Sequence, residues 1–333
     1  MLGAAVIGLG VGAQHAKAFA RTEGCELRWL HDHDAARAEA LRVEIGAGDV
    51  AKSFDAILED PKTDIVSLAT YDDHHGDQVV RALDAGKHVF CEKPLCHTEA
   101  ELAAIERAWK KSGRHLACNL VLRAAPVYAW LREAIGAGEF GEVYAVDGDY
   151  LYGRVHKITD GWRKNVDDYS VLLGGGVHMV DLMMWATGQR PDAVSAVGNR
   201  VATRGSAFRY DDFAAATFTF PSGMIGRITA NFGCVHRHQH VVRVFGTKKT
   251  FLYDDQGPRV WRARGDASEN HAEKLNLSPL PATKGDLIPS FIRSLQAGSD
   301  GRESTRHELA LVAACIASHR AHTSGLTTRI TYP

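Results

Sequence analysis

Hydrophobic residues in the first third of the chain form short, nearly continuous runs that polar segments separate. Such runs predict parallel strands, because a strand covered on both faces needs apolar side chains at successive positions. They cover residues 2–7, 26–32, 64–70, 88–91 and 115–122. Helical spacing lies between them, as at Leu102, Ile105 and Trp109. Thr98 with Glu101 predicts a capping box at the start of that helix. This alternation predicts a doubly wound α/β domain, a Rossmann fold with a parallel sheet, over residues 1–122.

The pattern changes at about residue 142, where further runs rich in β-forming residues predict strands without regular helices between them. These runs cover residues 142–152, 193–203, 213–220, 224–232, 239–245 and 250–253. Pro221, Ser222 and Gly223 predict a hairpin turn between two of them. The second domain, residues 123–333, is therefore expected to be α+β, with a large, mostly antiparallel sheet that leaves one face open. A final helix over residues 305–322 is expected to close the molecule.

Composition and charge place the chain among ordinary globular proteins. The 333 residues are 45% hydrophobic and 24% charged, with a formal net charge of −1, which suits two domains with full cores. Without a basic block or a long apolar run, neither a nucleic-acid nor a membrane partner is expected. Six cysteines without a Cys-x-x-Cys pair suit reduced thiols and a cytoplasmic location.

A glycine-rich turn follows the first predicted strand. Gly8 and Gly10 permit a tight turn in which backbone N–H groups approach a pyrophosphate, and the next helix would point its positive end at that anion. The spacing departs from Gly-x-Gly-x-x-Gly, because position 13 is Ala13 and Gly12 comes one residue early. The alternative is a strand–helix turn with a purely structural role.

Asp32 ends the second predicted strand, about twenty residues beyond the glycines, where a carboxylate accepts hydrogen bonds from an adenosine ribose. A carboxylate there would repel a 2′-phosphate, so NAD is expected rather than NADP. His31, His33 and Asp34 are interpreted as a solvated loop rather than a metal cluster, because neighbouring side chains of an extended strand point different ways.

Lys93 follows a short apolar run and stands between Glu92 and Pro94. This places it at the carboxyl end of a strand, the edge where open α/β sheets bind ligands. Proline restricts its own backbone and that of the preceding residue, so the lysine is expected to be held stiffly. The alternative is an ordinary strand end that carries a surface Glu–Lys pair.

The residues up to this point resemble the Gfo/Idh/MocA family, the glucose–fructose oxidoreductase and inositol dehydrogenase group of pyridine-nucleotide enzymes. The resemblance lies in the glycine turn with a nearby histidine, in Thr70 followed by His75, and in Glu92-Lys93-Pro94. It implies that Lys93 is the active-site lysine, that its bond to Pro94 is cis, and that these motif residues line the cofactor. It also implies a homodimer or homotetramer formed through the open sheet.

The second half resembles the same family. Residues 171–181 are similar to a helix on which an Asp and, four residues later, a His face the substrate. His178 matches that His and Asp181 lies one turn beyond it, but the Asp position falls on Gly174. The resemblance further implies cofactor contacts at Trp162 and Arg163. Substrate contacts are expected at Tyr150, Asp181 and Arg123. Arg123 with Pro126 resembles the Arg-x-x-Pro of the family, and Asn119 is a weaker candidate.

His236, His238 and His240 alternate and would share one face of a strand. The preferred interpretation is a polar face of the open sheet, and a zinc site is the alternative. No metal is expected.

These features together predict an NAD-dependent oxidoreductase that transfers a hydride between nicotinamide and a secondary alcohol or ketone of a sugar, cyclitol or sugar derivative. His178 is the expected base and Lys93 would stabilise charge on the reacting oxygen. A redox-neutral glycosidase or epimerase with tightly bound NAD remains open, as does a non-catalytic sensor of NAD and sugar. The sequence does not name the substrate.

Overall fold

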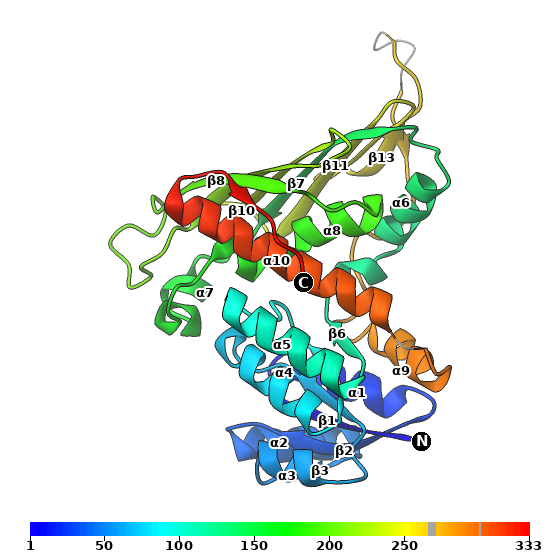
Figure 1. The fold of residues 1–333 in the computed structure, drawn as a ribbon, viewed down its shortest axis with the longest axis vertical. Coiled ribbons are helices and arrows are strands. Elements are labelled where there is room, and N and C mark those ends of the chain that lie inside the picture. Colours follow the sequence, from blue (N-terminus) through cyan, green and yellow to red (C-terminus); the bar gives the residue numbers. More distant parts are fainter. Residues whose placement is uncertain (266–270, 300) are drawn as a thin grey trace. The chain divides into compact units, whose positions relative to one another are not determined.

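The computed structural model describes residues 1–265, 271–299 and 301–333. They form two compact units (Figure 1). The first comprises Met1–Val121, Pro281–Leu309 and Pro333, and the second comprises Leu122–Leu280 and Ala310–Tyr332. No helix within the described residues is long and apolar enough to cross a membrane.

The first unit contains a parallel sheet with the strand order β3-β2-β1-β4-β5-β6 among its described residues. Its strands are β1 Leu2–Ile7, β2 Cys25–His31, β3 Asp49–Val50, β4 Ile65–Leu68, β5 His88–Cys91 and β6 Leu116–Cys118. Its helices include α1 Gly12–Arg21, α2 Ala35–Ile45, α3 Phe54–Glu59, α4 His75–Asp84, α5 Glu99–Ser112 and α9 Ile288–Gln296. The predicted Rossmann fold is confirmed, with the order typical of dinucleotide-binding sheets.

Two local predictions in this unit can be compared with the structure directly. Thr98 and Glu101 form the predicted capping box, because each side chain accepts a hydrogen bond from the other residue's N–H. The last strand is shorter than predicted. A 3₁₀ helix begins at Val121 and takes the place of the extended chain expected up to residue 122.

The segment Pro281–Leu309 belongs to the first unit, although the sequence placed it in the second domain. Ile288, Phe291 and Ile292 of α9 are buried in the first unit's core, with Phe19 and Phe90. The long helix α10, Arg302–Ser324, starts in the same unit. Apolar burial explains the difference, because α9 covers a hydrophobic surface that the residues before 122 leave uncovered.

The second unit contains a mixed sheet with the order β14-β13-β12-β11-β7-β10-β9-β8-β15 in the part of the chain described. Its strands are β7 Val143–Leu151, β8 Ala193–Asn199, β9 Phe213–Thr219, β10 Ile225–Asn231, β11 Gln239–Gly246, β12 Thr250–Asp254, β13 Gly257–Trp261, β14 Glu273–Lys274 and β15 Thr328–Arg329. All neighbours pair antiparallel except β7 and β10, which are parallel. The predicted hairpin at residues 221–223 joins β9 to β10 and is confirmed.

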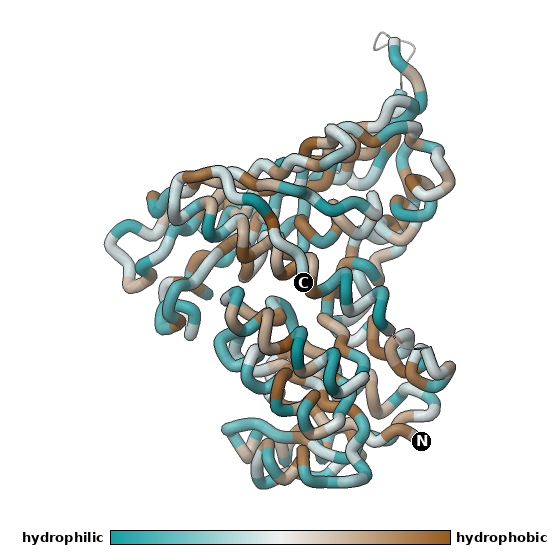
Figure 2. The backbone as a smooth tube through the Cα atoms, viewed as in Figure 1, coloured by the Kyte–Doolittle hydropathy of each residue, from teal (hydrophilic) through white to brown (hydrophobic). Residues whose placement is uncertain are grey.

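One face of this sheet is covered by helices and the other is open, as predicted. Successive side chains of a strand point to opposite faces, and hydrophobic and hydrophilic residues both occur along the chain of this unit (Figure 2). Ile228 and Ala230 of β10 are buried, whereas Ile225 and Arg227 on the other face are exposed. Helices α6 Pro126–Gly136 and α8 Val177–Thr187 lie along the covered face (Figure 1).

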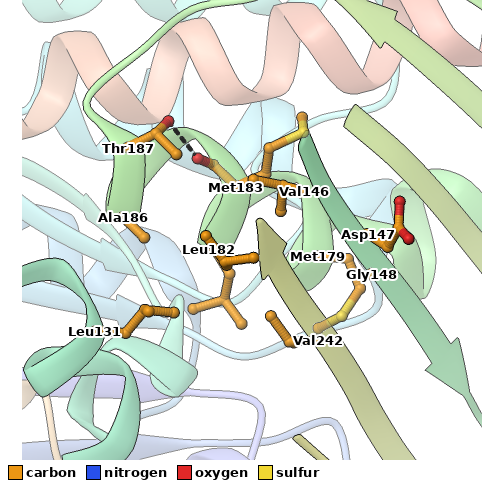
Figure 3. Close-up of a pocket in the computed structure, with 11 residues that line it drawn as sticks. Leu131, Val146, Asp147, Gly148, Met179, Leu182, Met183, Ala186, Thr187 and Val242 are labelled. Atoms are coloured by element: carbon orange, nitrogen blue, oxygen red, sulfur yellow. Dashed lines mark hydrogen bonds between the residues drawn. The ribbon is translucent and has the colours of Figure 1, made fainter. Parts of the chain in front are cut away.

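Glycines in the strands let α8 approach the sheet closely. A methyl group added at Gly148 of β7 would lie 2.9 Å from Cβ of Met179, and one added at Gly226 of β10 would overlap the sulfur of Met183. Only a cavity of about 10 Å³ is left between helix and strands (Figure 3). That volume holds one water molecule at most, so tight packing against the strands fixes α8 and, with it, His178.

Candidate active site

The glycine turn of the first unit lies between β1 and α1. Gly8 has φ of +81°, and a side chain there would come within 2.5 Å of the Ala69 carbonyl oxygen. Gly12 begins α1, and a methyl group there would lie 3.1 Å from Val6 and Ala69 side-chain atoms. An added methyl group at Gly10, by contrast, meets nothing within 4 Å. The turn thus leaves little room for a side chain at Gly8 or Gly12. A side chain would fit at Gly10, and its absence leaves the exposed backbone there accessible to a ligand.

Asp32 stands just beyond β2, at the same carboxyl edge of the sheet. Its Oδ2 accepts a hydrogen bond from the Leu9 N–H at 2.7 Å, and its Oδ1 accepts one from the Asp34 N–H at 2.9 Å. Burial alone would raise the pKa of this carboxyl group, but these hydrogen bonds and the charge of Arg37, 3.4 Å away, lower it. Asp32 is therefore ionised at neutral pH and tied to the glycine turn.

Lys93 follows β5 at this edge, as predicted, and its peptide bond to Pro94 is cis, also as predicted. The Pro94 carbonyl oxygen accepts a hydrogen bond from Nδ1 of His75 at 2.7 Å, and His75 is fully buried. Thr70, at the end of the neighbouring strand β4, donates its hydroxyl to Gln78 at 2.7 Å. The hydrogen bond from the buried His75 therefore fixes the backbone at Pro94, directly after Lys93.

A buried polar network surrounds the carboxylate of Glu92, the residue before Lys93. Glu92 Oε1 accepts hydrogen bonds from Nδ2 of Asn119 at 2.7 Å and from Nε2 of His15 at 3.2 Å. His15 Nδ1 lies 3.0 Å from the Ser67 hydroxyl. Burial would raise the pKa of Glu92, but the His15 hydrogen bond, the Lys93 charge and the Asn119 hydrogen bond lower it to about 2.

In the second unit, His178 lies on α8 within a cluster of aromatic rings. It is 8% exposed and stacks on Tyr150 of β7, with ring centroids 6.0 Å apart. His240 of β11 approaches both rings, at 6.0 Å from His178 and 5.4 Å from Tyr150. Because Tyr150, His178 and His240 come from three different elements, their packing fixes the His178 imidazole.

Asp181, one turn along α8, is 1% exposed and forms an ion pair with Arg123. The guanidinium donates from Nε to Oδ2 at 3.0 Å and from its terminal nitrogen to Oδ1 at 2.6 Å. Such two-point pairs are stronger and more directional than single ones. The two predicted substrate residues therefore bind each other beside His178.

The helical segment before His178 has an unusual start. Residues Leu172–Gly176 form a π-helical turn, which often marks a functional site. A side chain at Gly174 would overlap the hydroxyl group of Tyr169 and lie 2.8 Å from the ring carbon that bears it. That hydroxyl accepts a hydrogen bond from Nε of Arg163 at 3.0 Å, and the Arg163 guanidinium lies 4.5 Å from the Trp162 ring centroid.

Comparison with known proteins assigns both halves of the chain to one family. Residues 2–120 match the oxidoreductase family with an NAD-binding Rossmann fold, and residues 128–252 match the GFO/IDH/MocA C-terminal domain. The chain belongs to the Gfo/Idh/MocA oxidoreductase family. The resemblance drawn from the motifs is thereby confirmed.

Relatives in this family include dehydrogenases of sugars and cyclitols. The scyllo-inositol 2-dehydrogenase (NAD(+)) of Bacillus subtilis is 28% identical over 296 residues, covering 86% of this chain and 80% of that protein. The D-glucoside 3-dehydrogenase of Escherichia coli is 28% identical over 239 residues, covering 69% and 67%. An uncharacterized oxidoreductase of Rhizobium meliloti is 28% identical over 232 residues, covering 68% of this chain and 66% of the relative.

Solved structures share the fold over the whole length. Levoglucosan dehydrogenase in complex with NADH has a TM-score of 0.88 at 20% identity, covering 100% of both chains. An oxidoreductase domain protein from Kribbella flavida has a TM-score of 0.87 at 23% identity, covering 99% of each chain. At these identities the likeness establishes the fold alone.

The site of this Gfo/Idh/MocA protein contains residues that sequence patterns missed. Ser67 belongs to no recognised motif, and His15 was noted only as part of the family resemblance. Both residues nevertheless belong to the Glu92 network. Tyr169 gave no signal because its importance comes from Gly174, five residues away along an irregular loop. Burial of an acid, a histidine and an amide beside a lysine is visible only in three dimensions.

The alternating histidines do not form a polar patch on the open face of the sheet, so the preferred interpretation is wrong. His240 is 5% exposed and packs on Tyr150 under the helices, so it does not lie on the open face. His236 turns to Asp255 at 3.2 Å, while His238 Nδ1 lies 3.1 Å from the Leu151 carbonyl oxygen. The rings of His238 and His240 lie 4.9 Å apart and both pack on Tyr150, so these two share the covered side, and His236 alone turns away from it. Across the described ranges, no group of three His, Cys, Asp or Glu side chains is placed to hold a metal ion.

Proposed function

We propose that this protein is an NAD-dependent oxidoreductase acting on a secondary alcohol or ketone of a sugar, cyclitol or sugar derivative. The observation that carries the proposal is Lys93, which follows β5 at the carboxyl edge of a family-typical NAD-binding sheet. Ligands bind at this edge in open α/β folds. Relatives named as inositol and glucoside dehydrogenases support the substrate class.

The first unit fits the cofactor. The bare backbone at Gly10 and the start of α1 suit a pyrophosphate, and the ionised Asp32 suits the two hydroxyl groups of an unphosphorylated ribose. NAD supplies the hydride acceptor when it is bound. We assign the remaining cofactor contacts to residues of the recognised motifs. They are Gly8, Gly12, Ala13, Thr70, His75, Glu92, Lys93, Pro94, Trp162 and Arg163.

In the proposed reaction, His178 removes the proton of the substrate hydroxyl group. The proton must leave as the carbon loses its hydride, so a base within hydrogen-bond reach is required. Lys93 binds the same oxygen and stabilises the negative charge that develops there. Tyr150 and the Arg123–Asp181 pair support His178 and border the substrate.

A sensor that binds NAD and sugar without turnover is the second candidate. It is favoured by Gly174, which has no carboxylate and whose side-chain space is filled by Tyr169. A redox-neutral glycosidase or epimerase is the third. Incubation with sugars, cyclitols and their derivatives, with NAD or NADH, separates them. Absorbance change at the NADH band supports the oxidoreductase, product without net NADH supports the redox-neutral enzyme, and binding without product supports the sensor.

We also propose that the open sheet face of the second unit is covered by another copy of the chain in a homodimer or homotetramer. Val197 and Ile225 are 69% and 46% exposed on this face. Arg227 pairs with Asp147, and Arg243 pairs with Asp149 at 3.1 Å, which neutralises charges there. A cytoplasmic location is proposed as well, and it is supported by the six cysteines, none of which forms a disulfide bond.

A further inference from the structure

Asp168 of the second unit has a backbone conformation that residues with a side chain rarely adopt. Its φ is +53°, and no other non-glycine residue in the described ranges has a positive φ. Aspartate enters this left-handed region more readily than most residues, but the conformation still costs free energy. A strained residue of this kind persists only where its surroundings fix it, and such residues concentrate at functional sites. Asp168 is therefore a candidate for a functional role.

Two neighbours hold Asp168 in this conformation. Its backbone N–H donates a hydrogen bond to the hydroxyl oxygen of Tyr210 at 2.9 Å. Its carboxylate accepts one from Nε2 of His319, on α10, at 3.2 Å. The Asp168 side chain is 78% exposed, so the contact with His319 contributes little. The hydrogen bond to Tyr210 is thus the main restraint on this backbone.

The segment that holds Asp168 also holds the next residue, Tyr169. The ring of Phe208 lies 5.8 Å from the Tyr169 ring and 5.7 Å from the Tyr210 ring, measured between centroids. Tyr169 and Phe208 are both buried. Residues 208–210 therefore fix two consecutive residues, Asp168 through its backbone and Tyr169 through its ring.

Tyr169 in turn holds Arg163. Its hydroxyl oxygen accepts a hydrogen bond from Nε of Arg163 at 3.0 Å, and the Arg163 guanidinium lies 4.5 Å from the Trp162 ring centroid. A residue that left the left-handed region at position 168 would rotate the chain after it and carry this hydroxyl group away from Arg163. The conformation of Asp168 thus determines where the guanidinium of Arg163 lies.

We propose that Asp168 is a positioning residue for Arg163 and Trp162, two residues assigned above to the cofactor. This inference rests on the proposed function. Without the fixed acceptor on Tyr169, the long Arg163 side chain takes up several orientations. Ordering it again when NAD binds costs free energy, so the affinity for the cofactor falls.

The test compares substitutions that differ in how readily they adopt a positive φ. Valine is β-branched and disfavours this region, whereas glycine enters it without steric cost. In the full chain, Asp168→Val should raise the dissociation constant for NADH about tenfold, the effect of one misplaced hydrogen bond to a charged group. Asp168→Gly should bind NADH like the wild type. Asp167→Val, at the neighbouring position with a 97% exposed side chain, is the matched control and should also bind like the wild type. Fluorescence titration with NADH measures all four proteins.

Tyr210→Phe tests the same restraint with Asp168 in place. It removes the hydroxyl group that accepts the Asp168 N–H and keeps the ring beside Phe208. We expect weaker NADH binding, together with faster amide hydrogen exchange in residues 168–174. Mass spectrometry of peptides measures the exchange without any cofactor.

Folded Asp168→Val that binds NADH like the wild type overturns the proposal, and so does an equal loss of affinity in Asp168→Gly. If Asp168→Val does not fold, Tyr210→Phe decides, because unchanged affinity and unchanged exchange there contradict the positioning role. A wild-type protein that binds no NADH refutes the proposed function. NADH binding that does not respond to these substitutions refutes the positioning role alone.

Discussion

The hydroxyl group of Tyr169 occupies the space where a side chain at Gly174 would begin. Arg163 donates a hydrogen bond to that hydroxyl, and the rings of Phe208 and Phe232 pack against the tyrosine at centroid distances of 5.8 and 6.4 Å. Tyr169 is 2% exposed, so it has little room to move aside. The glycine at the position where relatives are expected to carry an acid is therefore a steric requirement of this chain.

Gly174→Ala should destabilise the protein by about 1–3 kcal/mol, because an added methyl group overpacks a rigid core. Thermal or urea unfolding measures the change. In a Tyr169→Ala background the same substitution should cost much less, since the obstruction is gone. Gly136→Ala is the control, because a methyl group there meets nothing within 4 Å, and it should be neutral or slightly stabilising. Equal costs of Gly174→Ala in both backgrounds would contradict the steric argument.

Lys93→Met should reduce turnover by several orders of magnitude while NAD affinity stays nearly unchanged. The lysine is proposed to stabilise charge on the substrate oxygen, and loss of one such group typically costs about 10²–10³-fold or more. Steady-state kinetics at the NADH band and a fluorescence titration with NADH measure the two quantities. His178→Ala should also lose turnover, and its remaining activity should rise toward alkaline pH, where hydroxide replaces the base. Near-normal turnover of Lys93→Met on the true substrate would defeat the active-site proposal.

Asp32→Ala should weaken NAD binding and narrow the preference for NAD over NADP. The carboxylate is ionised and would repel a 2′-phosphate, while Arg37, 3.4 Å away, would be released to attract one. Binding titrations with both cofactors test this. Asp34→Asn, which retains a cap for α2, serves as control and should leave the preference unchanged. A wild type that prefers NADP would show that the role assigned to Asp32 is wrong.

Stability should fall as the pH drops from about 6.5 toward 4, partly because of His88. Burial, with the charge of Arg114, lowers the pKa of this imidazole to about 4 in the folded protein. The unfolded chain binds the proton first, so the folded state loses stability across this window and keeps it above. His88→Asn retains an acceptor for the His115 N–H and removes the titration. It should reduce the pH-dependent loss by about 1–2 kcal/mol, which unfolding curves at pH 7.5 and 4.5 would show.

Light scattering at micromolar concentration should report a dimer or tetramer. Ile225→Asp and Val197→Asp should shift the protein toward monomer, because each buries a charge in the proposed contact. Val235→Asp changes a fully exposed valine outside the strands and should leave the mass unchanged. A wild-type protein that is entirely monomeric at this concentration would contradict the proposed assembly.

Local features of the fold could be predicted from the sequence, whereas long-range contacts could not. The glycine turn, the capping box at Thr98 and the hairpin at Gly223 depend on neighbours within a few residues, and each was predicted. The position of β7 between β10 and β11 was not, because strands joined by short connections usually pair directly. His240 was assigned to the wrong face for the same reason, since its side depends on how β11 pairs with β7.

The return of residues 281–309 to the first unit matters during synthesis of the chain. Leu30, Phe90 and their neighbours are translated early, but the apolar side chains of α9 that bury them arrive only after β7 to β14 of the second unit have been made. Until α9 has been made, part of the hydrophobic core of the Rossmann unit therefore stays exposed. Chaperones bind to exposed hydrophobic surface of this kind. A fragment that stops at residue 121 would carry the same exposed surface permanently, and soluble expression of the cofactor unit needs α9 supplied with it.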